Sequence, residues 1–290
     1  MNLRYSIQFT GGMEVTIKQD VDNTQLQTAI SQAVSEAGFP EAQVSVGKKN
    51  NFDTILVQTT LAGDEQVSKL SQSIQSSLQK NSFISNADEI LEQSVIGPSM
   101  GDFVKRSAIK AIIIGLIIMS VYILFAFSGM RTVISPVTLG LITILTMLFD
   151  LAVPMGIYGL MMKFNGAVQV DSIFIIALLT IIGYSINDTI IIFDRVRENV
   201  KTHEKDIESG RMSLEQIYED SLRQTMRRSL GTSVINFLIV ISMIFYGAGS
   251  LQLFAITLAV GIVFGTYSSI FLAAPAAFLF SKYRKIEESL

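Results

Sequence analysis

The sequence contains no cysteine and a single histidine, His203. The lack of cysteine excludes disulfide bonds, thiolate catalysis and cysteine-bound metals, and one histidine cannot form a histidine metal cluster. Charge is also scarce, because only 16% of the 290 residues are charged and the net charge of −3 points to no nucleic-acid partner. Apolar residues are abundant instead: they make up 49% of the chain, and the mean hydropathy of +0.46 is too high for an ordinary soluble domain.

Charged and apolar residues are distributed unevenly along the chain. Residues 1–108 hold 20 of the 47 formal charges and no long apolar run, whereas the remainder contains several runs long enough to cross a bilayer. The sequence therefore predicts an extracytoplasmic α+β domain over residues 1–104 and a transmembrane bundle over residues 105–290. The charged segment at residues 194–228 is expected to be a cytoplasmic loop of this bundle.

The amino-terminal region alternates between strand-like and helix-like patterns. Helical spacing runs from Leu26 to Ala37 and from Val67 to Leu78, while Gly11 and Gly12 predict a hairpin between the first two strands. Two helices interleaved among strands are typical of a ferredoxin-like α+β sandwich. Strands are predicted at residues 3–9, 13–18, 44–48, 53–60 and 90–96.

Five apolar runs in the second part are long enough to be membrane-spanning helices, because about 20 residues suffice to cross the hydrocarbon core. The second run contains Pro136 and Pro154, so kinks are expected there. The five predicted spans are residues 109–127, 133–162, 172–193, 230–246 and 251–280.

The basic residues predict the orientation of the spans. With the carboxyl terminus inside, the cytoplasmic side receives twelve basic residues near the membrane and the other side receives four, at positions 105, 106, 110 and 163. An odd number of spans then requires the amino-terminal domain to lie outside the cytoplasm. Residues 1–20 show no signal peptide or anchor, so we expect one further span upstream of this chain or in a fused neighbour.

The segment "GYSINDTIIIFDRVREN", residues 183–199, places Asp188 within an apolar helix. A carboxylate at the centre of a membrane helix costs about 2.5 kcal/mol or more, and such acids mark functional sites by default. Helical neighbours of Asp188 include Tyr184, Ser185 and Arg195, so its face is partly polar and is expected to look into the bundle. A merely structural aspartate is the alternative.

A second segment, "RQTMRRSLGTSVIN", places Arg228 at the mouth of the fourth span, followed by a polar stripe that includes Thr232 and Ser233. Asp150 is the other acid within a span. A nearby arginine favours the charged form of an acid and desolvation favours the neutral form, so a small movement of the arginine would load or release a proton. Ordinary helix–helix hydrogen bonding is the alternative for the stripe. The small residues Gly261, Gly265, Ser268 and Ser269 of the last span are expected to be a packing surface for a neighbouring helix.

These segments together resemble the SecF family, the smaller membrane subunit of the bacterial SecDF complex of protein export. "GYSINDTIIIFDRVREN" and "QTMRRSLGTS" are the specific matches, and "FTGG", "VIGPSMG" and "GIVFGTYSSIFLA" follow in the right order. The resemblance implies an RND-type bundle shared with SecD, located in the bacterial cytoplasmic membrane. It also implies use of the proton-motive force to complete the translocation of unfolded preproteins begun by the SecYEG channel and the SecA motor, with no enzymatic activity and no bound cofactor.

The resemblance also assigns roles to residues. Asp188 matches the intramembrane aspartate of the family, Arg228 matches its arginine, and Asp150 matches an acid that usually follows a histidine. Phe149 stands in place of that histidine, and Gln8 stands in place of the acid that usually precedes "FTGG". The family has six spans, one of them before this motif. This agrees with the further span that the odd number of predicted spans requires.

Several alternatives remain open from the sequence. Sodium is a possible coupling ion, because Asn187 and Thr189 would add oxygens to the Asp188 carboxylate. Asp150 and Asp188 would form an intramembrane aspartyl-protease dyad if they shared a proton, although the expected sequence contexts are absent. The chain would also suit one half of an RND-type small-molecule exporter, which needs a partner half.

Overall fold

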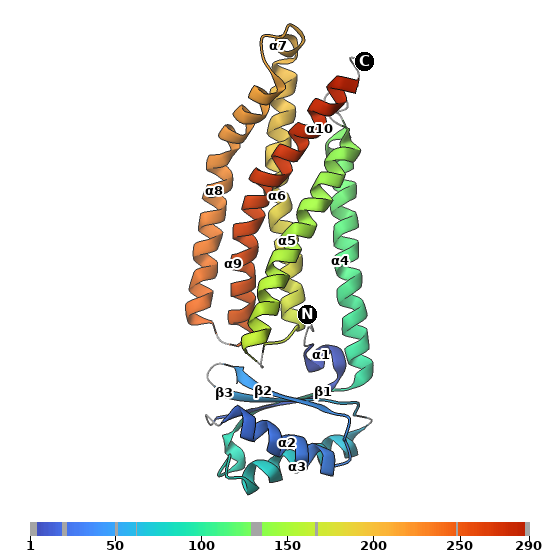
Figure 1. The fold of residues 1–290 in the computed structure, drawn as a ribbon, viewed down its shortest axis with the longest axis vertical. Coiled ribbons are helices and arrows are strands. Elements are labelled where there is room, and N and C mark those ends of the chain that lie inside the picture. Colours follow the sequence, from blue (N-terminus) through green and yellow to red (C-terminus); the bar gives the residue numbers. More distant parts are fainter. Residues whose placement is uncertain are drawn as a thin grey trace. The chain divides into compact units, whose positions relative to one another are not determined.

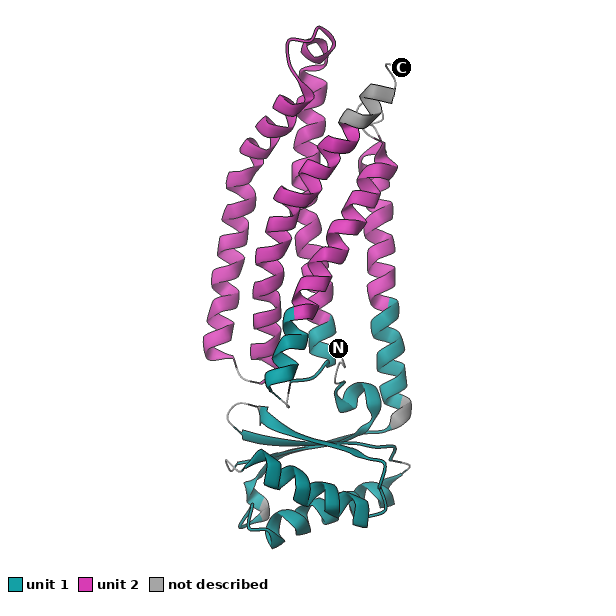
Figure 2. Cartoon of the chain, in the orientation of Figure 1, with its two compact units in different colours: residues 1–110, 157–175 teal, residues 111–156, 176–290 magenta. Residues whose placement is uncertain are grey.

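The computed structural model describes residues 5–18, 22–49, 52–61, 63–128, 135–165, 168–247 and 249–287. The chain divides into two compact units (Figure 2). Unit 1 contains Met1–Lys110 and Ile157–Ile175, and unit 2 contains Ala111–Gly156 and Ile176–Leu290.

Unit 1 contains a four-stranded antiparallel sheet with the strand order β2-β3-β1-β4. Helices α2 and α3 pack on one face of this sheet (Figure 1). This β-α-β-β-α-β order confirms the expected ferredoxin-like sandwich. The elements are β1 (Gly12–Ile17), α2 (Asn23–Glu36), β2 (Gln43–Lys49), β3 (Phe52–Gln58), α3 (Asp64–Lys80), a 3₁₀ turn (Ala87–Glu89) and β4 (Ile90–Ile96).

The core of the sandwich is formed by apolar residues that recur at strand spacing in the sheet and at helical spacing in α2 and α3. Val15 on β1 and Ile55 on β3 point to the helices, and Ile30 on α2 and Leu70 on α3 point to the sheet, all four being buried. Burial of apolar area at about 25 cal/mol per Å² stabilises this arrangement. Asp22 fixes where α2 begins, because its side chain accepts a hydrogen bond from the Thr24 amide at 2.9 Å.

The predicted hairpin around Gly11 and Gly12 is wrong. Of the segment 3–9, residues 3 and 4 lie outside the described residues, and the rest leads into a short helix, α1 (Ile7–Thr10). Ser6 caps α1, and Gly11 ends it with a φ of 76°, so the capping side chain overrides the strand-like alternation. Gly12 then lies so close to the Val57 carbonyl on β3 that a β-carbon there would collide with it.

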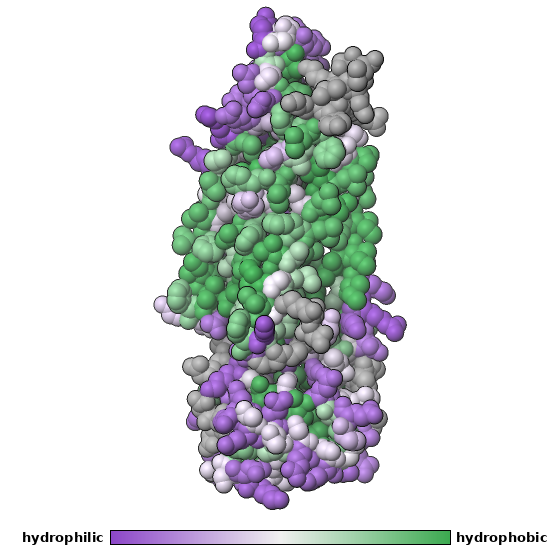
Figure 3. All heavy atoms as spheres, in the orientation of Figure 1, coloured by the Kyte–Doolittle hydropathy of each residue, from purple (hydrophilic) through white to green (hydrophobic). Residues whose placement is uncertain are grey.

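Within the residues that the structure describes, five helices are long and apolar enough to cross a membrane, which confirms the five predicted spans. Figure 3 shows the apolar surface along these helices and polar residues at their ends. Pro136 begins its helix, where proline is tolerated, and Pro154 lies inside it. The helices are α4 (Pro98–Ala126), α5 (Pro136–Phe164), α6 (Ser172–Thr202), α8 (Leu214–Tyr246) and α9 (Ser250–Ser268), the last continuing through a π-helical turn (Ser269–Ala273) into α10 (Ala274–Glu287).

The segment 194–228 differs from the expected loop, because most of it is helical. Helix α6 continues to Thr202, the short α7 (Glu204–Glu208) follows, and α8 begins at Leu214. A capping box between Ser213 and Gln216 fixes the start of α8. The buried Asn199 amide on α6 donates to Ser221 Oγ at 2.8 Å and to Gln224 Oε1 at 3.1 Å, so polar side chains join α6 to α8 here.

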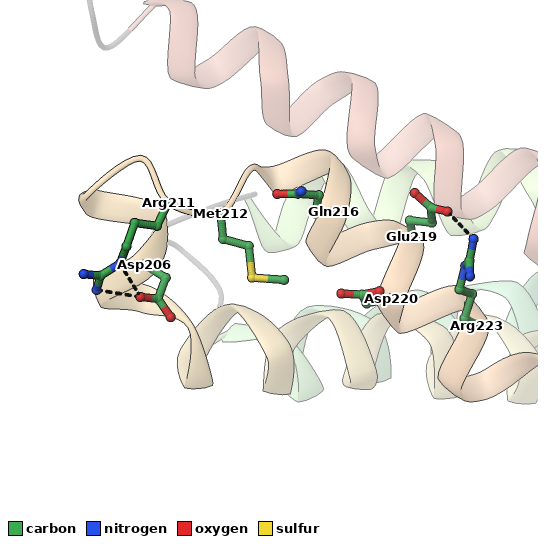
Figure 4. Close-up of a pocket in the computed structure, with 7 residues that line it drawn as sticks. All are labelled: Asp206, Arg211, Met212, Gln216, Glu219, Asp220 and Arg223. Carbon is green, nitrogen blue, oxygen red and sulfur yellow. Dashed lines mark hydrogen bonds and ion pairs between the residues drawn. The ribbon is translucent and has the colours of Figure 1, made fainter.

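The connection through α7 carries the charges of this segment on its surface. An open hollow of about 590 Å³ is lined by residues of α7, α8 and the turn between them. Figure 4 shows that in it Arg211 points to Asp206 and Arg223 points to Glu219. These ion pairs measure 2.7 and 2.8 Å and are solvent-exposed. Exposed pairs of this kind contribute little to stability, about 0–1 kcal/mol.

Candidate functional site: the buried acids of the helix bundle

Asp188 lies near the middle of α6 and is only 1% exposed. Among the residues that the structure describes, neither of its carboxylate oxygens has a hydrogen-bond partner. The Ser229 and Ser233 hydroxyls of α8 act on the carboxyl electrostatically, and both serines are buried. The Ser229 hydroxyl also lacks a partner in the described part of the chain. The site therefore combines a buried acid with unused hydrogen-bonding capacity, which is rare in folded proteins.

Arg228 influences Asp188 through its charge without forming an ion pair with it. The guanidinium acts on the carboxyl electrostatically, but the ion pairs found in the described ranges involve other arginines, at positions 195, 197, 211 and 223. Arg228 is exposed at the start of the apolar part of α8. The cation is thus available to move relative to the acid without breaking a direct salt bridge.

Asp150 belongs to a second cluster that also contacts α6. It is fully buried on α5, it accepts a hydrogen bond from Ser185 of α6, and it interacts with Ser268 at the end of α9. Its other oxygen, Oδ1, has no partner in the described residues. None of the interactions of Asp150 or Asp188 joins the two carboxyl groups, whereas a protease dyad needs two acids that share a proton.

Two further predicted site residues, Asn187 and Thr232, do not belong to the buried site around Asp188. Asn187 is exposed on α6, and Thr232 is exposed on α8, where its hydroxyl donates to the Arg228 carbonyl at 3.1 Å. Ser233, one residue further along α8, is buried at the site. Neighbouring helical residues differ by 100° in direction, and this rotation separates Ser233 from Thr232.

Sequence reasoning missed the role of α9 in the site. Thr266 Oγ1 lies 2.7 Å from Ser233 Oγ, and the Tyr184 hydroxyl donates to Ser233 Oγ at 2.6 Å. A β-carbon at Gly265 would lie 3.1 Å from Ser185 Cβ, and one at Gly261 would collide with Ile181. This confirms the predicted packing surface and identifies α6 as the neighbouring helix. Only the spacing of four residues between the two glycines was visible in the sequence.

The amino-terminal end of α6 is tied to the sheet domain within unit 1. Gln8 Oε1 of α1 accepts a hydrogen bond from the Ser172 amide at 2.8 Å, and the Ser6 amide donates to the Val170 carbonyl at 2.9 Å. Asn165 donates to the Lys48 carbonyl of β2 at 3.1 Å. The connection between α5 and α6 is therefore held to α1 and β2 by side-chain and main-chain bonds.

The family model described as protein export membrane protein SecD/SecF, C-terminal, matches residues 75–283. A SecF protein translocase subunit of Thermobaculum terrenum is 34% identical over 94% of this chain and 83% of its own length. The chain belongs to the SecF family.

Further SecF-family relatives support the assignment. The SecF subunit of Synechocystis is 30% identical over 97% of this chain and 84% of its own. The crystal structure of the SecDF membrane protein of Thermus thermophilus, described as translocon-associated, superimposes with a TM-score of 0.75 at 28% identity and covers 96% of this chain. This chain spans only 34% of that longer SecDF chain.

Proposed function

We propose that this SecF-family chain works with SecD in Sec protein export and uses the proton-motive force to promote late preprotein translocation. The observation that carries the proposal is Asp188, a buried acid within a membrane helix whose two oxygens are unpaired in the described residues. A charged group there costs about 2.5–3.5 kcal/mol on insertion scales. Such an acid is expected to bind and release a cation as its surroundings change.

The proton would move between two states of the site. When the Arg228 charge is close, the carboxylate is stabilised and the proton leaves; when it is remote, the neutral acid is favoured in the apolar surroundings. One proton moving across 100 mV releases about 2.3 kcal/mol, so a few protons per cycle suffice for a domain rearrangement. Asp150 and Ser185 form a second buried acid group that would respond to movement of α6.

Movement of α6 would reach the sheet domain through the bonds at its amino-terminal end. The Ser172 amide, at the first residue of α6, is held by Gln8 of α1. Because α6 also carries Asp188, the same helix takes part in proton uptake or release at Asp188 and in holding α1. The sheet domain, outside the cytoplasm in this proposal, would then pull on or retain the emerging preprotein. SecYEG with SecA would begin the translocation, and the carboxyl terminus would be cytoplasmic.

The decisive experiment replaces Asp188 by Asn in membrane vesicles that contain SecD, SecYEG and SecA. Preprotein export is measured with and without a proton-motive force. We expect Asp188→Asn to abolish the stimulation by the force while early, SecA-driven translocation continues. Asp194→Asn is the matched control, because Asp194 is an exposed acid on the same helix. Stimulation that survives in Asp188→Asn would refute the proposal.

A further inference from the structure

A row of hydroxyl groups leads to Asp188 from the side of the amino-terminal end of α6. The Tyr184 hydroxyl donates to Ser233 Oγ at 2.6 Å, and Ser233 Oγ lies 2.7 Å from Thr266 Oγ1. Tyr184 lies on α6, Ser233 on α8 and Thr266 on α9, so one row joins three helices. Tyr184 precedes Asp188 by four residues, about 6 Å along the helix axis.

Ser233 is the junction of this row because its single hydrogen has several acceptors within reach. It can go to the Ser229 carbonyl at 2.7 Å or to Thr266 Oγ1 at 2.7 Å. The Thr266 hydrogen has its own alternative, the Ile262 carbonyl at 2.9 Å. A hydroxyl both donates and accepts, so Ser233 can receive a proton from one partner while giving its own to another.

Asp188 lies at the end of the row with a gap that can close. The Ser233 hydroxyl lies beside its carboxyl, but the two Asp188 carboxylate oxygens have no hydrogen-bond partner within the described part of the chain. Rotation of the Asp188 side chain towards Ser233 would complete the row. A proton would then arrive at the Tyr184 oxygen, the Tyr184 proton would pass to Ser233, and the Ser233 proton would pass to the Asp188 carboxylate. Each hydroxyl gives up one proton and gains another, so the net change is one proton added to the Asp188 carboxylate.

We infer that Tyr184 and Ser233 form a hydroxyl chain that delivers protons to Asp188, gated by the Asp188 side chain. This inference rests on the proposed function, because it names the route to the same acid. Thr266 is a positioning residue in this chain, since it holds Ser233 from α9. The alternative is a set of hydrogen bonds that only joins the helices.

The test uses the full chain together with SecD in sealed vesicles of bacterial lipid containing a pH-sensitive dye. Proton uptake is measured after a potassium-diffusion potential is imposed, without sodium and again with sodium. The variants are Tyr184→Phe and Ser233→Ala. Tyr267→Phe and Ser242→Ala are the matched controls, because Tyr267 is exposed on α9 and the exposed Ser242 donates to the Ile239 carbonyl of its own helix.

We expect both chain variants to lose at least about tenfold in proton uptake, since a positioned proton donor contributes about 10²–10⁴-fold to a transfer rate. The controls should stay within about twofold of the unsubstituted chain, and Ser233→Thr, which restores a hydroxyl, should recover uptake. The Ser233→Thr readout applies even if Ser233→Ala folds poorly.

Three results separate the inference from the proposed function. Full uptake in Tyr184→Phe, together with loss in Asp188→Asn, would overturn the hydroxyl chain and leave the energy-coupling role intact. Sodium-dependent transport that requires Asp188 would overturn the hydroxyl chain together with the use of the proton-motive force, and would leave the role of Asp188 in coupling intact. Unchanged uptake in Asp188→Asn would overturn both.

Discussion

Replacing Gly261 by Ala should loosen the contact between α9 and α6, with a cost that the structure allows us to estimate. The added β-carbon would collide with the Ile181 side chain, and such overpacking costs about 1–3 kcal/mol. Alanine also favours the helix over glycine by about 0.5–1 kcal/mol. Gly231→Ala is the matched control, because a β-carbon at Gly231 on α8 has no atom within 4 Å. The helix gain is common to both variants, so their difference isolates the packing cost.

The assay is the free energy of unfolding of the purified chain, from titration of detergent micelles with SDS. We expect Gly261→Ala to be less stable than Gly231→Ala by about 1–3 kcal/mol, a factor of about 5–150 in the folding equilibrium. Gly231→Ala itself should match or slightly exceed the unsubstituted chain. Equal stability of the two variants would show that α9 does not approach α6 closely at this point, and the positions of Gly265 and Thr266 would then need revision.

Three further substitutions test other parts of the fold. Asn199→Leu should destabilise the α6–α8 contact by about 0.5–1.5 kcal/mol, because it removes the hydrogen bond that the buried Asn199 amide donates to the buried Ser221 hydroxyl, measurable in the same SDS titration. Ser213→Ala should cost about 0.5–2 kcal/mol at the start of α8, seen as faster amide exchange over its first turn but not at its centre. Ile30→Ala should cost about 2–5 kcal/mol in the sheet domain, seen as faster exchange of the β1 and β3 amides. Thr28 is exposed on the same helix, so Thr28→Ala should change the exchange of these amides little.

The spans and the sandwich could be predicted from the sequence because their signals are local. Each apolar run is longer than the hydrocarbon is thick, and Ile30 repeats with its neighbours at helical spacing. The hairpin prediction failed because the Ser6 cap and the conformation of Gly11 compete with strand alternation over a few residues. The predicted loop at 194–228 proved helical because charge indicates exposure to water, which a helix beyond the apolar region also provides.

The candidate site was only partly predictable. Asp188 is evident as an acid in an apolar run, but its surroundings depend on how three helices rotate about their axes. Thr232 and Ser233 looked equivalent in the sequence. The rotation of α8 about its own axis buries Ser233 and leaves Thr232 exposed. The bond between Asp150 and Ser185 joins residues 35 positions apart, so it requires the relative register of α5 and α6. Helical spacing along one segment does not contain that information.

The length of α6 has a mechanical consequence. Its 31 residues contain no proline, and at 1.5 Å per residue they extend about 46 Å, half as long again as the hydrocarbon thickness of about 30 Å. Asp188 is close to the midpoint, about 24 Å from Ser172. If the helix pivots there as a stiff rod, a rocking motion of about 10° would displace the Ser172 end by about 4 Å. A subtle rearrangement around one carboxyl group would thus be magnified into a stroke larger than a water molecule.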